Sequence, residues 1–296
     1  MDITLRQLSV FVAIARGGNL AEASARCGIT RAAVSMALSS LERMAGGPLF
    51  VRAGHGLRLN DRGRMLLPGA EGLVSGAHEW LASARGQGGE LAGELRLGCS
   101  LTIGNYCLPA VLQGFRKAHP KASVSVRIGN SSDTAAGLRD GAFDLALVES
   151  DAVLHGFDAE VWTKDELLVV AAPLDPLSRR AGELALRDLA GREWVLREPG
   201  SGTREIAESF LRRVPGVRAR IEMGGAEAIK RAVASGMGLA LLSRHAVSDE
   251  LASGRLCALR ISRNPLRRFH LLQVPGQHMS SLCRSFRDWL RDNRPA

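Results

Sequence analysis

The pattern of apolar residues changes near residue 93, and this change constrains the fold more than any other feature of the sequence. Before it, apolar side chains recur every three or four positions, the spacing of amphipathic helices. After it, short apolar runs alternate with helical segments almost to the C-terminus, which indicates an α/β architecture with parallel sheets. The 296 residues are therefore expected to divide into a small helical unit and a larger α/β unit.

Composition places the chain among ordinary globular proteins. Apolar residues make up 46% and charged residues 23%, which excludes a largely disordered chain. No apolar run approaches the roughly 20 residues of a membrane span. The N-terminus lacks the basic start and the apolar stretch of a signal peptide, so we expect a cytoplasmic protein with no membrane partner.

The first sixty residues predict three helices. The first covers 4–16 and ends at a pair of glycines, the second covers 20–27 and ends at Gly28, and the third begins after Thr30 as its N-cap. The third helix has one apolar face and one face of small polar and basic side chains. This order of short helix, glycine turn and second amphipathic helix is typical of a helix-turn-helix.

Basic charge is concentrated in the same region. Residues 1–64 contain nine arginines against four acidic residues, while the whole chain has a net charge of +9. Double-stranded DNA is the expected partner, read by the outer face of the third helix and by a basic hairpin over 48–63. The alternative is a three-helix core with a solvated basic face. The residues expected to contact DNA are Thr30, Arg31, Ala32, Ser35, Met36, Ser39, Arg52 and Arg58.

Residues 61–87 predict one long helix of about 40 Å, at 1.5 Å per residue. A narrow apolar stripe follows it with alternating spacings of four and three, which is the pattern of a coiled-coil seam. Such a stripe indicates a second copy of the chain as partner, in a homodimer or homotetramer, whereas the alternative is packing on the same chain. The segment Gly86-Gln87-Gly88-Gly89 follows as a hinge. The expected seam residues are Leu66, Ala70, Leu73, Ala77, Trp80 and Ala84.

From residue 94 the chain shows two series of alternating strands and helices, which predicts two subdomains with a cleft between them. The expected strands are 94–99, 123–128, 143–149, 166–173, 193–198, 218–222, 238–242 and 267–274. The expected helices are 103–118, 131–140, 203–213, 225–236, 243–252 and 279–292.

Three segments rich in hydroxyls or acidic side chains follow strands of this region, where sheets of this class bind ligands. Two of them precede helices, whose first backbone N–H groups attract anions, so we expect an anionic ligand there. The alternative is that the hydroxyls only cap helices. The expected effector-binding residues are Ser100, Leu101, Thr102, Glu149, Glu198, Ser201, Gly202, Thr203 and Arg204.

Glu149 conflicts with an anionic ligand, because a carboxylate repels it. Two solutions are open: either Glu149 carries a proton and donates it to the ligand, or the ligand arrives protonated and Glu149 accepts its hydrogen bond. Both solutions predict that binding weakens as the pH rises.

The motifs LRQLSVFVAIARGGNLAEASARCGITRAAVSMALSSLERMAGGPLFVR and LNDRGR, within residues 4–64, resemble the winged helix-turn-helix of the LysR-type transcriptional regulators. The α/β region is similar to the periplasmic-binding-protein-like effector domain of that family. The resemblance implies a DNA-binding domain over 1–60, a dimerisation helix over 61–89 and an effector domain over 90–296, with RNA polymerase as a further partner.

The same resemblance implies that the effector domain has two lobes. Lobe I comprises 90–161 and 268–296, and lobe II comprises 162–267, with crossings near Trp162 and Arg267. The motifs GCSLTIGNYCLP, LVES, REPGSGTRE and GGAEAIKRAVASGMGLALLSRHAV resemble the CysL-like branch, which implies a role in sulfur metabolism and an effector such as sulfite or sulfate.

Other functions are less consistent with the sequence. A cytoplasmic solute-binding protein would have no use for the helix-turn-helix. A regulator of the same fold that senses a different small organic ligand stays open. An enzyme would have to use Glu149, His155 and His245, which show no catalytic spacing, and no cofactor or metal motif is present. The five cysteines include no CxxC pair and are expected as buried thiols, with redox sensing by Cys99 and Cys107 as a minor alternative.

Overall fold

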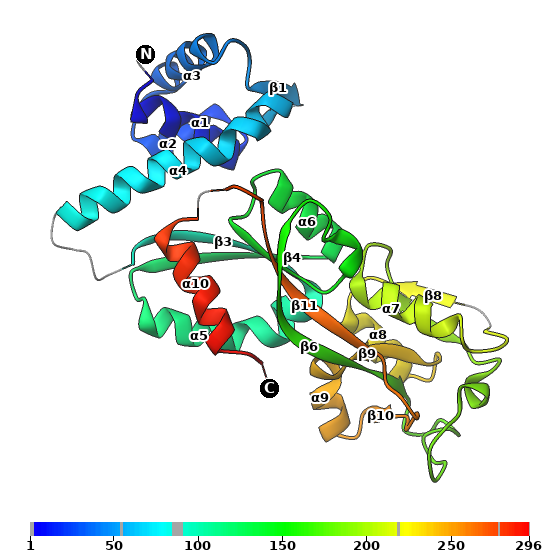
Figure 1. Cartoon of the computed structure of the whole chain (residues 1–296). Coiled ribbons are helices and arrows are strands. Elements are labelled where there is room, and N and C mark those ends of the chain that lie inside the picture. Colours follow the sequence, from blue (N-terminus) through cyan, green and yellow to red (C-terminus); the bar gives the residue numbers. More distant parts are fainter. Residues whose placement is uncertain (1–2, 54–55, 85–90, 218–219, 278, 296) are drawn as a thin grey trace.

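The structure is a computed structural model that describes residues 3–53, 56–84, 91–217, 220–277 and 279–295 (Figure 1). The N-terminal unit is a winged helix-turn-helix, as the sequence predicts. Its helices begin at the side-chain caps Thr4, Asn19 and Thr30, and α1 and α2 end at glycines with positive φ. Its elements are α1 (Leu5–Gly17), α2 (Leu20–Cys27), α3 (Arg31–Met44) and the antiparallel hairpin of β1 (Phe50–Ala53) and β2 (Gly56–Leu59).

The long helix α4 (Asp61–Ala84) follows the hairpin and packs against α1. Leu67 and Ala70 are buried in the core of the N-terminal unit. This corrects one residue of the expected seam, because Ala70 faces α1 of its own chain and is not available to a second chain. The hinge expected at Gly86–Gly89 lies outside the described residues, as does the side chain of Ala84.

The larger unit has two lobes, and lobe I comes first in the chain. Its sheet order is β4, β3, β5, β11 and the first half of β6. Helices α5 and α10 cover one face of the sheet, and α6 covers the other, each over its own apolar cluster. These elements are β3 (Gly93–Ser100), α5 (Leu108–Ala118), β4 (Ala122–Gly129), α6 (Ser131–Arg139), β5 (Leu145–Val148), β6 (Asp158–Ala171), β11 (Leu266–Gln273) and α10 (Ser281–Asp292).

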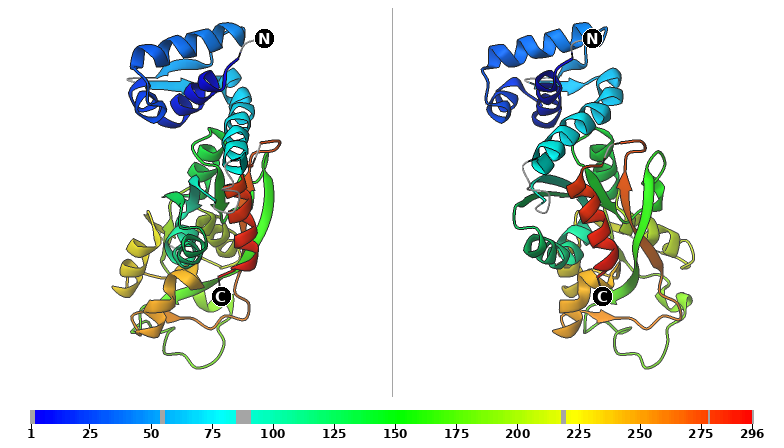
Figure 2. Two further views of the ribbon diagram at one scale, coloured as in Figure 1. Left: turned by 90° about the vertical axis from the view of Figure 1, so that its left-hand side faces the viewer. Right: turned by 60° about the vertical axis from the view of Figure 1, so that its left-hand side comes forward.

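Lobe II continues the sheet from the second half of β6, with α7 packed on one face and α8 and α9 on the other. Figure 2 shows lobe II at the end of the molecule furthest from the N-terminal unit. Its elements are β7 (Trp194–Arg197), α7 (Gly202–Leu211), β8 (Arg220–Met223), α8 (Ala226–Ala234), β9 (Ala240–Ser243), α9 (Arg244–Ala252) and β10 (Cys257–Ala258).

The lobes are joined by two long strands rather than by loops. β6 and β11 run antiparallel, and each extends from one lobe to the other, with a register shift between Phe269 and His270. Within the described residues, parallel ladders join β3 with β4, β3 with β5 and β7 with β8, and single parallel bridges join Leu184 with Ile261 and Trp194 with Leu239. The expectation of parallel sheets is therefore corrected, because the crossing strands make the sheet mixed in lobe I and pair antiparallel with β9 and β10 in lobe II.

Two local features differ from the expected helices and strands. The helix expected from residue 103 begins with a π-helical segment, Ile103–Cys107, before α5. The strand expected at 166–173 begins eight residues earlier, at Asp158, because β11 pairs with this polar segment. Short 3-10 turns at Asp151–Val153 and Leu186–Leu189 complete the elements.

Candidate DNA-binding face and interlobe site

Helix α3 buries one face in the N-terminal core and presents the other to solvent. Val34, Leu38 and Leu41 are buried. The residues expected to read DNA from the opposite face, Arg31, Ala32, Ser35, Met36 and Ser39, are all exposed. The sequence-predicted DNA contacts of α3 therefore share one accessible surface.

The hairpin places two further basic side chains on the surface. Arg52 and Arg58 are exposed, and the pairing of Val51 with Arg58 and of Arg52 with Leu57 holds them on adjacent strands. Thr30 is exposed at the start of α3, where its hydroxyl accepts a hydrogen bond from the backbone N–H of Ala33. Thr30 therefore caps α3 while it stays exposed to solvent.

The site between the lobes is organised by Arg267, which lies on β11 at the crossing and is 5% exposed. Its Nε donates to Asp165 Oδ2 at 2.7 Å, and its Nη1 donates to Thr203 Oγ1 at 2.9 Å. Its Nη2 donates to Thr102 Oγ1 at 3.3 Å and lies 3.3 Å from Glu149 Oε2. One guanidinium thus connects lobe I to lobe II.

Two of the predicted hydroxyls, those of Thr102 and Thr203, accept hydrogen bonds from this guanidinium. Neither Thr102 nor Ser201 makes a side-chain capping bond. The Oγ atoms of Ser100 and Ser201 are buried without a hydrogen-bond partner among the described residues. The interpretation of these groups as helix caps alone is therefore not supported for Thr102 and Ser201, and two buried hydroxyls are free to bind something else.

Glu149 is buried at the end of β5, and Thr203 donates to its Oε1 at 3.3 Å. Its Oε2 has no hydrogen-bond partner in the described part of the chain, although the guanidinium of Arg267 is close by. The conflict between Glu149 and an anionic ligand is therefore reduced by a positive charge that the sequence analysis did not include in the site.

The structure separates three predicted residues from this centre. Arg204 points elsewhere, because its guanidinium donates to Glu208, to Glu222 and to the backbone carbonyl of Arg197. The expectation that Arg204 adds a donor to the effector is corrected on this ground. Glu198 is paired with Arg197. Burial alone would raise the pKa of Glu198, but the Arg197 guanidinium lowers it. Leu101 is half-buried and lies opposite Gly225.

Gly202 allows the lobes to meet closely. A Cβ atom built at this position would lie 2.4 Å from the backbone oxygen of Glu149. Further interlobe contacts surround it: Ser150 Oγ donates to Glu205 at 2.5 Å, and Tyr106 donates to Glu227 at 2.6 Å. A glycine at the start of α7 is therefore required by the close approach of β5.

Sequence reasoning identified Arg267 only as a crossing point and missed Asp165 altogether. Asp165 Oδ1 also accepts a hydrogen bond from Ser243 at 2.8 Å. The sequence offered no clear local signal, because Asp165 lies between Lys164 and Glu166 and Arg267 lies beside Arg268, so both look like ordinary surface charges. Of the two histidines that the enzyme alternative would use, His155 is exposed, and His245 Nε2 lies 3.9 Å from Asp165 Oδ1.

The cysteines are free thiols. Burial raises the pKa of Cys99, and it raises the pKa of Cys107 to about 12. Both shifts disfavour the thiolate that reacts with oxidants. Among the described residues, no group of histidine, cysteine and acidic side chains is arranged to hold a metal ion.

The exposed face of α4 carries apolar side chains. Leu66, Leu73 and Trp80 are spaced by seven residues and are 38%, 61% and 70% exposed. Ala77 is half-buried. Within the described residues, no helix is long and apolar enough to cross a membrane.

Comparison with known proteins matches both units of the chain. Residues 5–64 match the bacterial regulatory helix-turn-helix proteins of the lysR family, and residues 88–295 match the LysR substrate binding domain. The chain is 38% identical to the HTH-type transcriptional regulator YeiE of Escherichia coli over 98% of this chain and 97% of the relative. It is 31% identical to the regulator CbbR of Rhodospirillum rubrum over 97% and 95%.

Solved structures agree with this assignment of the fold. A full-length OxyR variant from Pseudomonas aeruginosa superposes with a TM-score of 0.80 at 21% identity, covering 99% of this chain and 95% of that one. The CcmR regulatory domain of Synechocystis, solved in complex with 2-PG, is 30% identical with a TM-score of 0.63, covering 68% and 96%.

Proposed function

The chain belongs to the LysR family of DNA-binding transcriptional regulators, and we propose that the effector which controls it is a small oxyanion bound around Arg267 between the lobes. Family membership defines a regulator with a small-molecule effector rather than an enzyme. The proposal concerns the chemistry of that effector, which follows from the groups around the guanidinium. The 30% identical CcmR regulatory domain, solved in complex with 2-PG, supports binding of a small ligand by this domain.

The observation that carries the proposal is a pair of buried hydroxyls without partners, in segments whose threonines Thr102 and Thr203 bind the buried cation Arg267. Ser100 and Ser201 come from different lobes, and neither Oγ has a partner in the described part of the chain. Leaving such groups unpaired costs free energy, so a ligand that accepts hydrogen bonds from both is favoured. The backbone N–H groups at the start of α7 add donors and a positive partial charge. A compact oxyanion has acceptor oxygens for all of these donors.

The charges of the site select the protonation state of the ligand. Arg267 is paired with two buried carboxylates, Glu149 and Asp165, so a fully ionised anion meets an excess of negative charge. A proton must accompany the ligand, held either by the oxyanion or by Glu149. We expect affinity to fall as the pH rises, because this proton is lost. The resemblance to CysL-like regulators makes sulfite and sulfate the first candidates.

We also propose that the regulator binds DNA as a dimer through α4, with α3 and the hairpin reading the duplex. The exposed residues Leu66, Leu73 and Trp80 form an apolar line along α4 in a single chain. Arg31, Arg52 and Arg58 lie on the exposed face proposed for DNA and supply cations for phosphate contacts.

The effector assignment is tested by calorimetric titration of the full chain with sulfite, sulfate, thiosulfate and O-acetylserine at several pH values. We expect an inorganic oxyanion to bind, and binding to weaken in Ser201→Ala and Thr102→Ala. Ser209→Ala is the matched control, because Ser209 is an exposed serine on the same helix as Ser201 and lies away from Arg267.

Two outcomes would remove the assignment. One is that none of the inorganic oxyanions binds. If O-acetylserine binds in their place, the effector is an organic molecule. The other is that the anion binds equally well to Ser201→Ala, Thr102→Ala and the control.

A further inference from the structure

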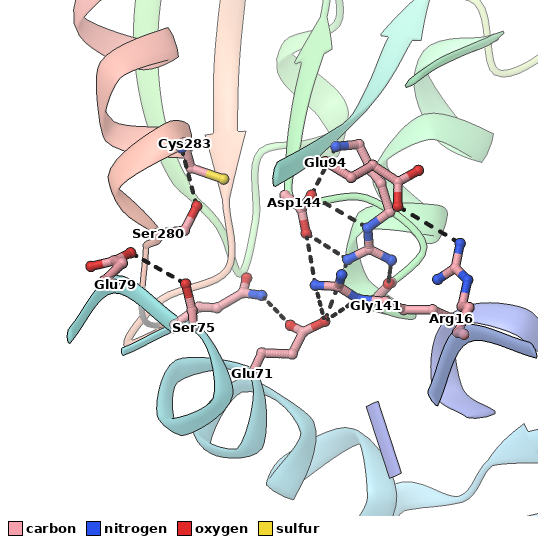
Figure 3. A network of polar contacts seen from close by, with 12 residues as sticks. Arg16, Glu71, Ser75, Glu79, Glu94, Gly141, Asp144, Ser280 and Cys283 are labelled. Atoms are coloured by element: carbon pink, nitrogen blue, oxygen red, sulfur yellow. Dashed lines mark hydrogen bonds and ion pairs between the residues drawn. The ribbon is translucent and has the colours of Figure 1, made fainter. Parts of the chain in front are cut away.

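The N-terminal unit, α4 and lobe I meet at a buried cluster of charges (Figure 3). Arg16 comes from α1, Glu71 from α4, Arg96 from β3, and Asp144 from the turn before β5. The side chains of Glu71, Arg96 and Asp144 are only 7%, 9% and 11% exposed. We name these four residues the docking cluster.

Glu71 holds the cluster together. Its Oε1 accepts from Arg16 Nη2 at 3.1 Å and from Arg96 Nη2 at 3.4 Å. Its Oε2 accepts from Gln277 Nε2 at 3.0 Å, just before α10. One carboxylate of α4 therefore binds the N-terminal unit on one side and two separate segments of lobe I on the other.

The charges are balanced within the docking cluster. Arg96 donates to Asp144 Oδ1 at 2.5 Å and to the carbonyl of Gly141 at 2.9 Å, and Arg16 lies 3.6 Å from Asp144. Burial alone would lower the pKa of Arg96, but Asp144 and Glu71 raise it. Two cations and two carboxylates thus neutralise one another, with three of them buried and the side chain of Arg16 24% exposed.

An apolar contact accompanies the ion pairs. Gly141 has a φ of +75°, and a Cβ atom there would lie 2.5 Å from Leu67 Cδ2 of α4. The turn before β5 is therefore shaped to receive the buried side chain of the linker helix as well as its charge.

The docking cluster and the interlobe site lie at opposite ends of the same two strands. β3 carries Arg96 near its start and Ser100 at its end, while Asp144 precedes β5 and Glu149 follows it. These strands are paired in parallel. At a rise of about 3.3 Å per residue, the four to five residues between the two sites correspond to roughly 13–17 Å. The two paired strands therefore connect the interlobe site directly to the docking cluster.

We propose that the docking cluster couples the state of the interlobe site to DNA binding within each chain, by holding the DNA-binding unit and α4 in a defined position on lobe I. The coupling to an effector rests on the proposed function, whereas the coupling between the two residue clusters does not. Separating buried, mutually neutralised charges leaves carboxylates and guanidiniums without partners, which is strongly unfavourable. The contact is therefore either fully made or released, as a switch requires.

A double-mutant cycle on DNA affinity tests this without any effector. Arg16→Gln weakens the docking cluster, and Thr203→Val removes the hydroxyl through which Arg267 and Glu149 meet lobe II. The dissociation constant is measured for all four proteins on the intergenic DNA upstream of the chain's own gene. Distant, independent substitutions have additive effects. We expect Thr203→Val to change DNA affinity in the wild-type background at least about fivefold more than in the Arg16→Gln background.

The matched control is Arg26→Gln. Arg26 also pairs with lobe I, with Glu94 at 3.7 Å, but both side chains are about 40% exposed, so this pair contributes little. It should leave the effect of Thr203→Val unchanged. Gln277→Ala is the substitute if Arg16→Gln folds poorly. Gln277 contacts Glu71 from lobe I, so its loss should reproduce the effect of Arg16→Gln.

A second readout is hydrogen exchange of α1 and of the first turn of α10. Thr203→Val should accelerate exchange there in the wild-type background and not in the Arg16→Gln background. Additive effects on DNA affinity for Thr203→Val with both Arg16→Gln and Gln277→Ala would overturn the proposal. An absence of oxyanion binding would leave these measurements intact, so failure of the effector assignment is distinguished from failure of the coupling.

Discussion

Truncation of Trp80 on α4 is the sharpest test of how the chains associate. The side chain is 70% exposed in a single chain, which corresponds to about 170 Å² of the roughly 250 Å² of a tryptophan. At about 25 cal/mol per Å², burying this surface is worth up to about 4 kcal/mol per chain. Ordering costs reduce this gain, so we expect Trp80→Ala to destabilise the dimer by about 4 kcal/mol for its two copies together.

This free energy corresponds to a roughly thousandfold weaker dimer. Sedimentation velocity over nanomolar to micromolar protein measures the dissociation constant, and DNA retardation under the same conditions should weaken with it. Leu174→Ala is the matched control, because Leu174 is 76% exposed in the turn after β6 and lies off α4. A Trp80→Ala protein that associates like the wild type, or a wild type that is monomeric at micromolar concentration, would refute association through α4.

Three further predictions follow from individual side chains. Arg31→Ala combined with Arg52→Ala should weaken DNA binding and reduce the magnitude of the slope of log affinity against log salt by roughly 3.6, because the dimer loses four phosphate contacts, as measured by retardation at several salt concentrations; an unchanged slope would place both outside the phosphate contacts. Glu79 on α4 is buried enough to raise its pKa, but the backbone N–H at the start of α10 lowers the pKa below its ordinary value. A folded-state pKa below the unfolded one stabilises the protein at pH values above the unfolded pKa, and this stabilisation is lost as the pH falls. Glu79→Gln should therefore reduce the loss of thermal stability between about pH 5 and pH 3. The same decrease of melting temperature in both proteins over this range would contradict this. Because burial raises the pKa of Cys99 and Cys107, both should react with iodoacetamide at pH 8 far more slowly in the native protein than in denaturant; equal rates by mass spectrometry would indicate accessible thiolates.

Much of the N-terminal unit could be predicted because its signals are local. Thr30 and the glycines at 18 and 28 specify helix ends through contacts within four residues, and the apolar spacing of α3 specifies its buried face. The hydroxyls of the interlobe site were also accessible to prediction, since strand ends in a sheet of this kind bring Ser100 and Ser201 near the same crossing.

Other elements could not be predicted from local pattern. The first half of β6 is polar and becomes a strand only because β11 pairs along it. Ala70 fits a coiled-coil seam by spacing, yet α1 buries it in the chain's own core. The spacing of apolar residues identifies the stripe on α4. Whether a residue of the stripe packs on its own chain or stays exposed depends on whether it lies beside the N-terminal unit or beyond it.

The sequence by itself determined the class of protein: the helix ends, the basic face of α3, the long linker helix and the two series of strands and helices follow from neighbouring residues. Only the tertiary structure decided which charges meet. Arg267 reaches Thr102 across 165 residues of sequence, and Glu71 joins Arg16 to Arg96 across separate units. The physical reason is that a buried charge is stable only with a partner, and the packing of strands and helices distant in sequence decides which partner lies within bonding distance.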